Sequence, residues 1–263
     1  MNDPHVKTLY YRIVPGSHVD YEKAPAVIED TEHFKMYVDG EKVRFDMKVH
    51  CSTVNEARKL TDEYLRLWNI LISLEHNPGD LNFKYQDADI IDLSPSPIDS
   101  QNIRLSVHNT VHAITSMDAV LHLSHNTYPS RPERFCLSPD VEKMYLRYKN
   151  YRQGREPLTT MANVCLTLLQ ASTGSKNKQR EKAAEKYRID KTVLSKLGEL
   201  CDRGSQAEAR KAPKKGSFVP LTEKEKQWIE TVIKAIIRRA GEVAYDSKAK
   251  LNLLTMSDFP CIP

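Results

Sequence analysis

The sequence predicts an α+β fold, in which an N-terminal antiparallel sheet packs against one long helix and is followed by a C-terminal all-α helical bundle. Two observations lead to this prediction. Apolar and polar residues alternate along much of residues 1–126, whereas apolar residues recur at three- and four-residue spacing after residue 139. Residues 1–126 carry 12 Lys+Arg and 19 Asp+Glu, while residues 127–263 carry 27 and 16. We therefore expect an acidic sensor or interaction domain over 1–126, a Pro-containing linker over 127–139 and a basic helical domain over 140–263.

The first predicted strand covers Val6–Val14, where Tyr, Ile and Val are frequent and Pro15-Gly16 ends the pattern. A hairpin follows, because Phe34–Val38 and Val43–Val49 alternate on either side of Asp39-Gly40. Both residues of an Asp-Gly step tolerate positive φ, as the centre of a tight hairpin requires. We expect the apolar residues of its second strand to face the core: Val43, Phe45, Met47 and Val49.

A long helix is predicted over Thr53–Glu75. Thr53 and Glu56 have the spacing of a capping box, in which each side chain bonds the backbone N–H of the other residue. The helix carries a continuous apolar stripe at helical spacing, made of Ala57, Leu60, Tyr64, Leu67, Trp68, Leu71 and Leu74. Trp68 is predicted to be a core anchor rather than a ligand contact.

Further strands are predicted after this helix. Leu81–Tyr85 alternates, and Ile90–Leu93 continues the strand past a bulge near Asp87. Ile103–Ile114 alternates again, and Val120–Leu123 is expected to pair with it. The helix stripe and one face of the sheet would then share a single core.

The second half predicts a bundle. Ser138 is placed to cap a helix with Pro139 at its first position, and Pro157 opens another whose apolar residues run nearly all round it. The second of these helices is expected at the bundle centre. A further capping box, Thr222 with Glu225, begins a last helix with a wide apolar face. Its exposed side is predicted to carry Lys224, Lys234, Arg238 and Arg239.

The stretch Gln179–Leu200 predicts two short helices joined by a tight turn. Ala183, Ala184 and Tyr187 share one face of the first helix, and Asp190 is placed to cap the second. The second helix has an apolar face made of Leu194, Leu197, Gly198 and Cys201.

This stretch of 22 residues resembles the helix-turn-helix of DNA-binding proteins. The family places small or apolar residues late in the first helix, one apolar residue after the turn and two anchors in the second helix. Those places are occupied here by Ala183, Ala184, Tyr187, Ile189, Leu194 and Leu197. The sequence departs from the family in the turn, where Arg188 stands at a position that is often Gly because it needs positive φ.

The resemblance and the basic charge together predict a non-enzymatic, nucleic-acid-binding protein of regulatory character, with DNA or RNA as its partner. The second helix would lie near the groove, with Lys191, Thr192, Ser195 and Lys196 on its outward side. Phosphate contacts are expected from Lys186, Arg188, Arg210 and Lys211. Such cations favour binding because they release counterions condensed on the phosphate backbone.

Two other functions stay open. The protein could be a structural or regulatory interaction module whose basic face meets an acidic protein partner or its own first half. It could also be a metal-dependent enzyme centred on histidines of the first half, since His108 and His112 would point the same way from a strand. Asp87 and Asp89 would likewise share a strand face, where they could hold a divalent ion or simply discourage sheet-to-sheet pairing.

Several classes are excluded by what the sequence lacks. It has no Gly-rich phosphate loop, Walker sequence or G-x-S-x-G elbow, and we expect no cofactor. Five scattered Cys without a C-x-x-C pair argue against a disulfide framework and a thiolate zinc site. The polar N-terminus and the absence of a long apolar run predict a cytoplasmic protein without a signal peptide, a membrane helix or a membrane partner.

The helical half also resembles small helical domains that include the RNA-cutting HEPN proteins, in which a catalytic Arg and His lie a few residues apart on a helix. All nine His of this chain lie at or before His125, so the helical half has none. Arg12 with His18 and Arg44 with His50 have a suitable gap but fall in predicted strand and turn segments. We therefore expect at most a catalytically silent bundle of similar shape.

Overall fold

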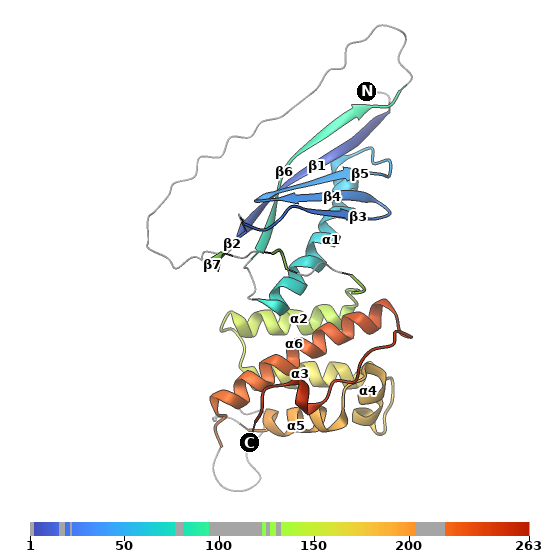
Figure 1. The fold of residues 1–263 in the computed structure, drawn as a ribbon. Coiled ribbons are helices and arrows are strands. Elements are labelled where there is room, and N and C mark those ends of the chain that lie inside the picture. The colour runs from blue at the N-terminus through green and yellow to red at the C-terminus, as the bar shows by residue number, and fades with distance from the viewer. Residues whose placement is uncertain are drawn as a thin grey trace. The chain divides into compact units, whose positions relative to one another are not determined.

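The computed structural model describes residues 3–15, 19–21, 23–76, 81–94, 123–124, 127–129, 133–203 and 219–262. The chain forms two compact units, Met1–Arg131 and Pro132–Pro263, whose boundary falls inside the segment that the sequence marks as a linker. The first unit contains an antiparallel sheet and a long helix, and the second is helical (Figure 1). The fold is therefore α+β, as the sequence predicts.

The sheet of the first unit has five antiparallel strands in the order β3-β4-β5-β1-β6. Their bounds are Pro4–Pro15 (β1), Val27–Asp30 (β3), Phe34–Asp39 (β4), Lys42–Met47 (β5) and Leu81–Asp92 (β6). Two short strands, β2 (Val19–Asp20) and β7 (Leu123–Ser124), pair in parallel outside this sheet. The sequence did not indicate β2 or β3. The strand predicted over Ile103–Ile114 lies outside the described residues.

The β4–β5 hairpin is confirmed, but its turn is one residue further along than expected. Asp39 pairs with Lys42, so Gly40 and Glu41 form the two-residue loop. Gly40 has a φ of +56°, whereas Glu41 keeps an ordinary φ. The prediction of positive φ at both Asp39 and Gly40 was therefore wrong, because Asp39 already belongs to the strand ladder.

The predicted bulge in β6 is confirmed. Tyr10 pairs with Asp87 and Tyr11 pairs with Tyr85, which leaves Gln86 as the extra residue on β6. A second irregularity leaves Lys7 extra on β1. Each bulge shifts the alternation of its own strand by one residue, and the paired residues of β1 and β6 still share a face on either side of it.

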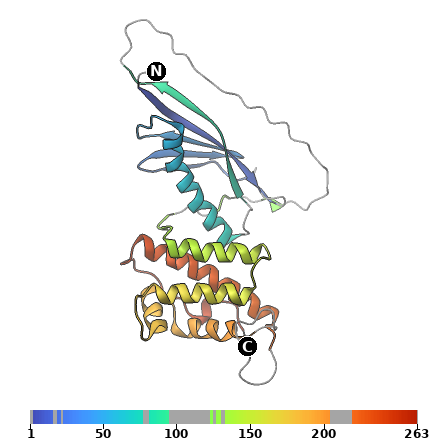
Figure 2. The ribbon, with the colours of Figure 1, turned by 180° about the vertical axis from the view of Figure 1, so that it is seen from behind.

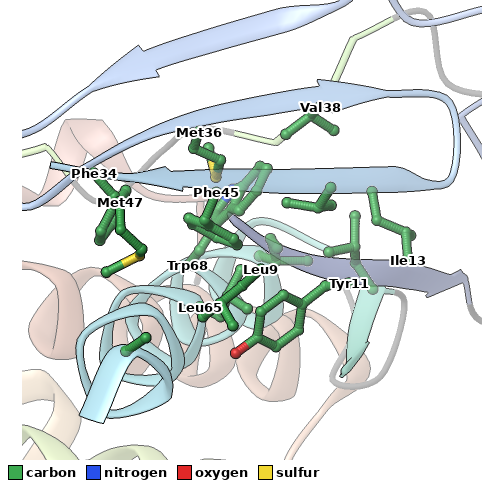
Figure 3. Packing of buried hydrophobic residues seen from close by; sticks show 14 of the residues in the cluster. Leu9, Tyr11, Ile13, Phe34, Met36, Val38, Phe45, Met47, Leu65 and Trp68 are labelled. Atoms are coloured by element: carbon green, nitrogen blue, oxygen red, sulfur yellow. The ribbon is translucent and has the colours of Figure 1, made fainter. Parts of the chain in front are cut away.

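Helix α1 (Val54–Glu75) covers one face of the sheet. Its capping box is complete, because the N–H of Glu56 donates to Thr53 Oγ1 at 3.2 Å and that of Thr53 donates to Glu56 Oε2 at 3.2 Å. Figure 3 shows the side chains of β1, β4 and β5 pointing toward α1 and meeting Leu65 and Trp68. Trp68 is fully buried and its indole N–H donates to the carbonyl of Pro129 at 3.3 Å, which confirms it as a core anchor.

The second unit contains five α-helices among its described residues: α2 (Pro139–Arg152), α3 (Leu158–Ala171), α4 (Gln179–Tyr187), α5 (Lys191–Cys201) and α6 (Glu223–Tyr245). As predicted, Ser138 caps α2 and Thr222 with Glu225 forms a capping box on α6. Helix α3 packs against all four of the others and lies between α2 and α5 (Figures 1 and 2). Trp228 of α6 is fully buried and contacts Phe259 edge to face.

The segment before α2 packs on α6 at a glycine. The ring of Phe135 is buried against the backbone of Gly241, so closely that a Cβ at Gly241 would lie 2.1 Å from a ring carbon. The N–H of Cys136 donates to the carbonyl of Gly241 at 3.0 Å. A side chain at position 241 would therefore displace this segment.

We expect Gly241→Ala to lower the free energy of unfolding by about 1–3 kcal/mol, because the added methyl group overpacks a buried ring. Alanine otherwise stabilises a helix by about 1 kcal/mol relative to glycine. Gly198→Ala is the matched control, since its Cβ would meet only the movable end of the Arg180 side chain. Urea denaturation of both variants checks this, and a stabilised Gly241→Ala protein would contradict it. Adding Phe135→Leu to Gly241→Ala should recover part of the loss.

Candidate nucleic-acid interface

The turn between α4 and α5 consists of Arg188, Ile189 and Asp190. Arg188 has a φ of +51°, in the left-handed region that costs a non-glycine residue about 1 kcal/mol or more. This is the position at which the helix-turn-helix family often has Gly. Asp190 caps α5 as predicted, because its Oδ1 accepts from the N–H of Thr192 at 2.8 Å.

The C-terminal segment holds this turn in place. The N–H of Leu254 donates to the carbonyl of Arg188 at 2.9 Å, and the N–H of Asp190 donates to the carbonyl of Leu254 at 2.7 Å. Ile189 and Leu254 thereby form an isolated parallel bridge. The sequence showed no pattern beyond Tyr245, yet this segment satisfies backbone groups that the turn exposes.

Arg239 of α6 was predicted to be exposed, and this was wrong. Only 7% of the residue is exposed, and its Nη1 donates to the carbonyls of Tyr187, Arg188 and Asn252 at 3.3, 3.4 and 2.7 Å. Its Nε lies 3.1 Å from Glu242 Oε2. Burial lowers the pKa of the guanidinium, although Glu242 acts in the opposite direction. Arg239 follows Val232 and Ile236 at helical spacing, so it lies in the buried stripe of α6.

Helices α4 and α5, joined by this turn, form a helical hairpin, the α4–α5 hairpin. Each of its two helices buries one face. Ala183 and Tyr187 are buried on α4, and Ile189 is buried in the turn. On α5 the buried residues are Val193, Leu194, Leu197, Leu200 and Cys201. The hydroxyl groups of Tyr187 and Ser172 lie 2.6 Å apart and tie α4 to the end of α3. Among the described residues, α5 is therefore packed against the bundle along one side only.

The predicted base-contacting residues lie on the other side of α5. Lys191 and Thr192 are exposed, while Ser195 and Lys196 are half-buried. Lys191 pairs with Glu181 at 2.8 Å, and the pKa of Glu181 is lowered mainly by that hydrogen bond. Lys196 pairs with Glu199 at 3.2 Å. Exposed ion pairs of this kind contribute little stability. Each lysine can therefore exchange its carboxylate partner for another anion at little cost.

The predicted phosphate-contacting residues are only partly described. Lys186 and Arg188 are exposed at the end of α4, and Lys186 Nζ donates to the carbonyl of Ser172 at 2.8 Å. Arg210 and Lys211 lie outside the described residues. The structure thus brings Lys186 and Arg188 to the turn that leads into α5.

Sequence reasoning missed a line of lysines that starts at Lys178, the residue just before α4, and continues on α4. Lys178, Lys182 and Lys186 follow one another at four-residue spacing, and all three are exposed. We call this set the α4 lysine ridge. Within the described part of the chain, no ion pair involves these three residues. Because residues four apart lie on one face of a helix, the spacing of Lys182 and Lys186 could have revealed their part of the ridge, whereas Lys178 precedes the helix with a φ of +51°.

The candidate metal-binding residues are only partly described, and those that are described form no metal site. His108 and His112 lie outside the described residues. Asp87 and Asp89 do share the predicted strand face, since they pair with Tyr10 and Thr8, and Asp89 accepts from the Tyr10 hydroxyl at 2.8 Å. Among the residues that the structure describes, no three His, Cys, Asp or Glu side chains are grouped as a metal would require.

We expect Arg239→Met to lower the free energy of unfolding by about 1–3 kcal/mol, because it removes the buried donor to the Tyr187 carbonyl and the donor to the Asn252 carbonyl while keeping most of the side-chain volume. Arg238→Met is the matched control. It removes the same charge from a side chain that is 47% exposed, so its effect should stay within about 0.5 kcal/mol. Thermal and urea unfolding measure both, and equal effects would contradict the buried role of Arg239.

Replacing Arg188 with Gly should stabilise the protein by about 1 kcal/mol, because glycine adopts the left-handed conformation without strain. Arg188→Ala provides the comparison, since alanine keeps the strain and removes the same charge. Urea midpoints of the two variants check this. A Gly variant that is no more stable than the Ala variant would contradict the strain at this turn.

None of the described helices is both long and apolar enough to cross a membrane. Comparisons with protein-family models, with curated proteins and with solved structures found no match to this chain.

Proposed function

We propose that the helical unit binds nucleic acid, DNA or RNA, and that it does so without catalysis. The observation that carries this proposal is the α4–α5 hairpin, in which α5 is buried along one side and leaves Lys191 and Thr192 exposed on the other. In this proposal the outward side of α5 meets the groove, and the α4 lysine ridge and Arg188 contact phosphates.

The charge of the unit supports the proposal. Residues 132–263 carry 26 Lys+Arg and 16 Asp+Glu, a net charge of +10. Each cation that neutralises a phosphate releases condensed counterions, so binding weakens as salt rises with a logarithmic slope of about −0.9 per contact on duplex DNA. Four contacts from the ridge and Arg188 would give a slope of about −3.6.

The turn supports the proposal as well. A helix that reads a groove must be held in one orientation, and α5 is held at its start by the Asp190 cap and by the contacts of Arg188 to Leu254 and Arg239. The proposal includes a cytoplasmic location, which fits five cysteines that are all free.

The test is a fluorescence-anisotropy titration of the full chain with labelled duplex DNA, duplex RNA and single strands at two salt concentrations. We expect Lys182→Glu to weaken binding and to lower the salt slope by about 1–2, because it removes one phosphate contact and adds repulsion. The matched control is Lys143→Glu on the exposed side of α2, which makes the same charge change away from α4 and α5.

Three results would contradict the proposal. The wild-type protein could fail to bind any of the probes at low salt. It could bind with an affinity that does not depend on salt. Lys143→Glu could weaken binding as much as Lys182→Glu does, which would mean that net charge and not the hairpin determines affinity.

A further inference from the structure

The sheet of the first unit has a face that α1 does not cover. Helix α1 packs on the face that carries Leu9, Phe45 and their neighbours, and no described helix of the first unit lies on the opposite face, which we call the outer face (Figures 1 and 2). Antiparallel sheets often expose one face to water. Exposure alone therefore does not indicate a partner, but the side chains that this face carries do.

One row of the outer face has the composition of an interface centre. The strand registers align Ile28, Tyr37, Arg44 and Tyr10 across β3, β4, β5 and β1. Ile28 is 57% exposed, and the guanidinium carbon of Arg44 lies 4.2 Å from the centre of the Tyr37 ring. Tyr and Arg are enriched at the centres of protein interfaces, where they carry much of the binding energy. We call these four residues the middle row.

Opposite charges flank the middle row on three strands. On one side, row A contains Lys35 (β4), Asp46 (β5) and Asp89 (β6). On the other side, row B contains Asp39 (β4), Lys42 (β5) and Lys84 (β6). Each of the three strands thus has a lysine on one side of the middle row and an aspartate on the other. Neighbouring strands place some of these charges side by side within the sheet, which stabilises it locally.

The outer face also carries a groove. A groove of about 860 Å³ is lined by the middle row together with Arg12, Asp39 and Lys42, and it includes none of the row A residues. The side of row B is therefore hollow, while row A lies outside the groove.

We propose that the outer face is the interface of a homodimer, with a second copy of this chain as its occupant. A two-fold axis along the middle row turns one outer face onto the other and exchanges the two flanking rows, as an isologous interface requires. Lys42 then faces Asp46 of the other copy, Lys35 faces Asp39, and Lys84 faces Asp89. The same rotation brings row A of one copy over the groove of the other.

The size of this face sets the expected affinity. Five strands spaced by about 4.8 Å and three rows spaced by about 7 Å give a face of about 500 Å² per copy. About 1,000 Å² buried in total lies at the lower end for a specific interface, so we expect a micromolar dissociation constant rather than a permanent dimer. The inference concerns the first unit and does not depend on nucleic-acid binding by the second.

Sedimentation velocity of the full chain over about 1–200 µM tests the proposal, since this range brackets a micromolar constant. The wild-type protein should shift from monomer to dimer. Lys42→Asp and Asp46→Lys should each weaken association about tenfold or more, because like charges then face each other across the interface. Lys59→Asp, on the exposed side of α1, is the control and should dimerise like the wild type.

Mixing the two variants gives the sharper result. In a heterodimer of Lys42→Asp with Asp46→Lys, both facing pairs have opposite charges again, so the mixture should associate more tightly than either variant alone. Asp46 also accepts from Thr8 and pairs with Arg44 within its own chain, so circular dichroism must first show that the variant is folded. If the Asp46→Lys variant is not folded, a mixture of Lys84→Asp with Asp89→Lys tests the same restoration of opposite charges.

Two results would overturn the proposal. One is a wild-type protein that remains monomeric over the whole concentration range. The other is a mixture of folded variants that associates no more tightly than its components.

Discussion

The second unit depends on the contact between Arg239 and the backbone of the α4–α5 turn. Burying a guanidinium is costly unless its donors are satisfied, and here three carbonyls and the Glu242 carboxylate satisfy them. The same contact gives a donor to the Tyr187 carbonyl at the end of α4 and a second donor to the Arg188 carbonyl, which also accepts from Leu254. Because the three carbonyls belong to the end of α4, the turn and the C-terminal segment, one side chain joins α4, α6 and the tail. The turn that leads into α5 is part of this junction.

In the first unit, the corresponding constraint is the alternation of side chains along the strands. Apolar residues of β1, β4 and β5 point to α1 and form the core, so the intervening residues must form the outer face. The bulges at Lys7 and Gln86 each shift the alternation of their own strand by one residue, while paired residues of β1 and β6 still share a face. The core thereby determines which tyrosines and charges come together on the opposite side.

Local patterns made much of this fold predictable, since capping boxes and alternation depend on residues close in sequence. The burial of Arg239 could have been inferred from its position in the α6 stripe, and the part of the α4 lysine ridge made by Lys182 and Lys186 from its spacing. Other features depend on contacts distant in sequence. Leu254 pairs with Ile189 across 65 residues, and the partner of Lys191 is on another helix. β3 is too short, at four residues, to show a clear alternation. Of the candidate site, the face of α5 was therefore predictable, but its ion pairs were not.

The two tryptophans of the chain are divided between the units, with Trp68 against the sheet and Trp228 inside the bundle. Both indoles are fully buried, but that of Trp68 donates to Pro129, whereas the N–H of Trp228 has no described acceptor. Each unit therefore contains its own intrinsic fluorophore in a distinct environment. Replacing one tryptophan with phenylalanine would leave an emission signal that follows the melting of a single unit, so the cooperativity between the units becomes directly observable.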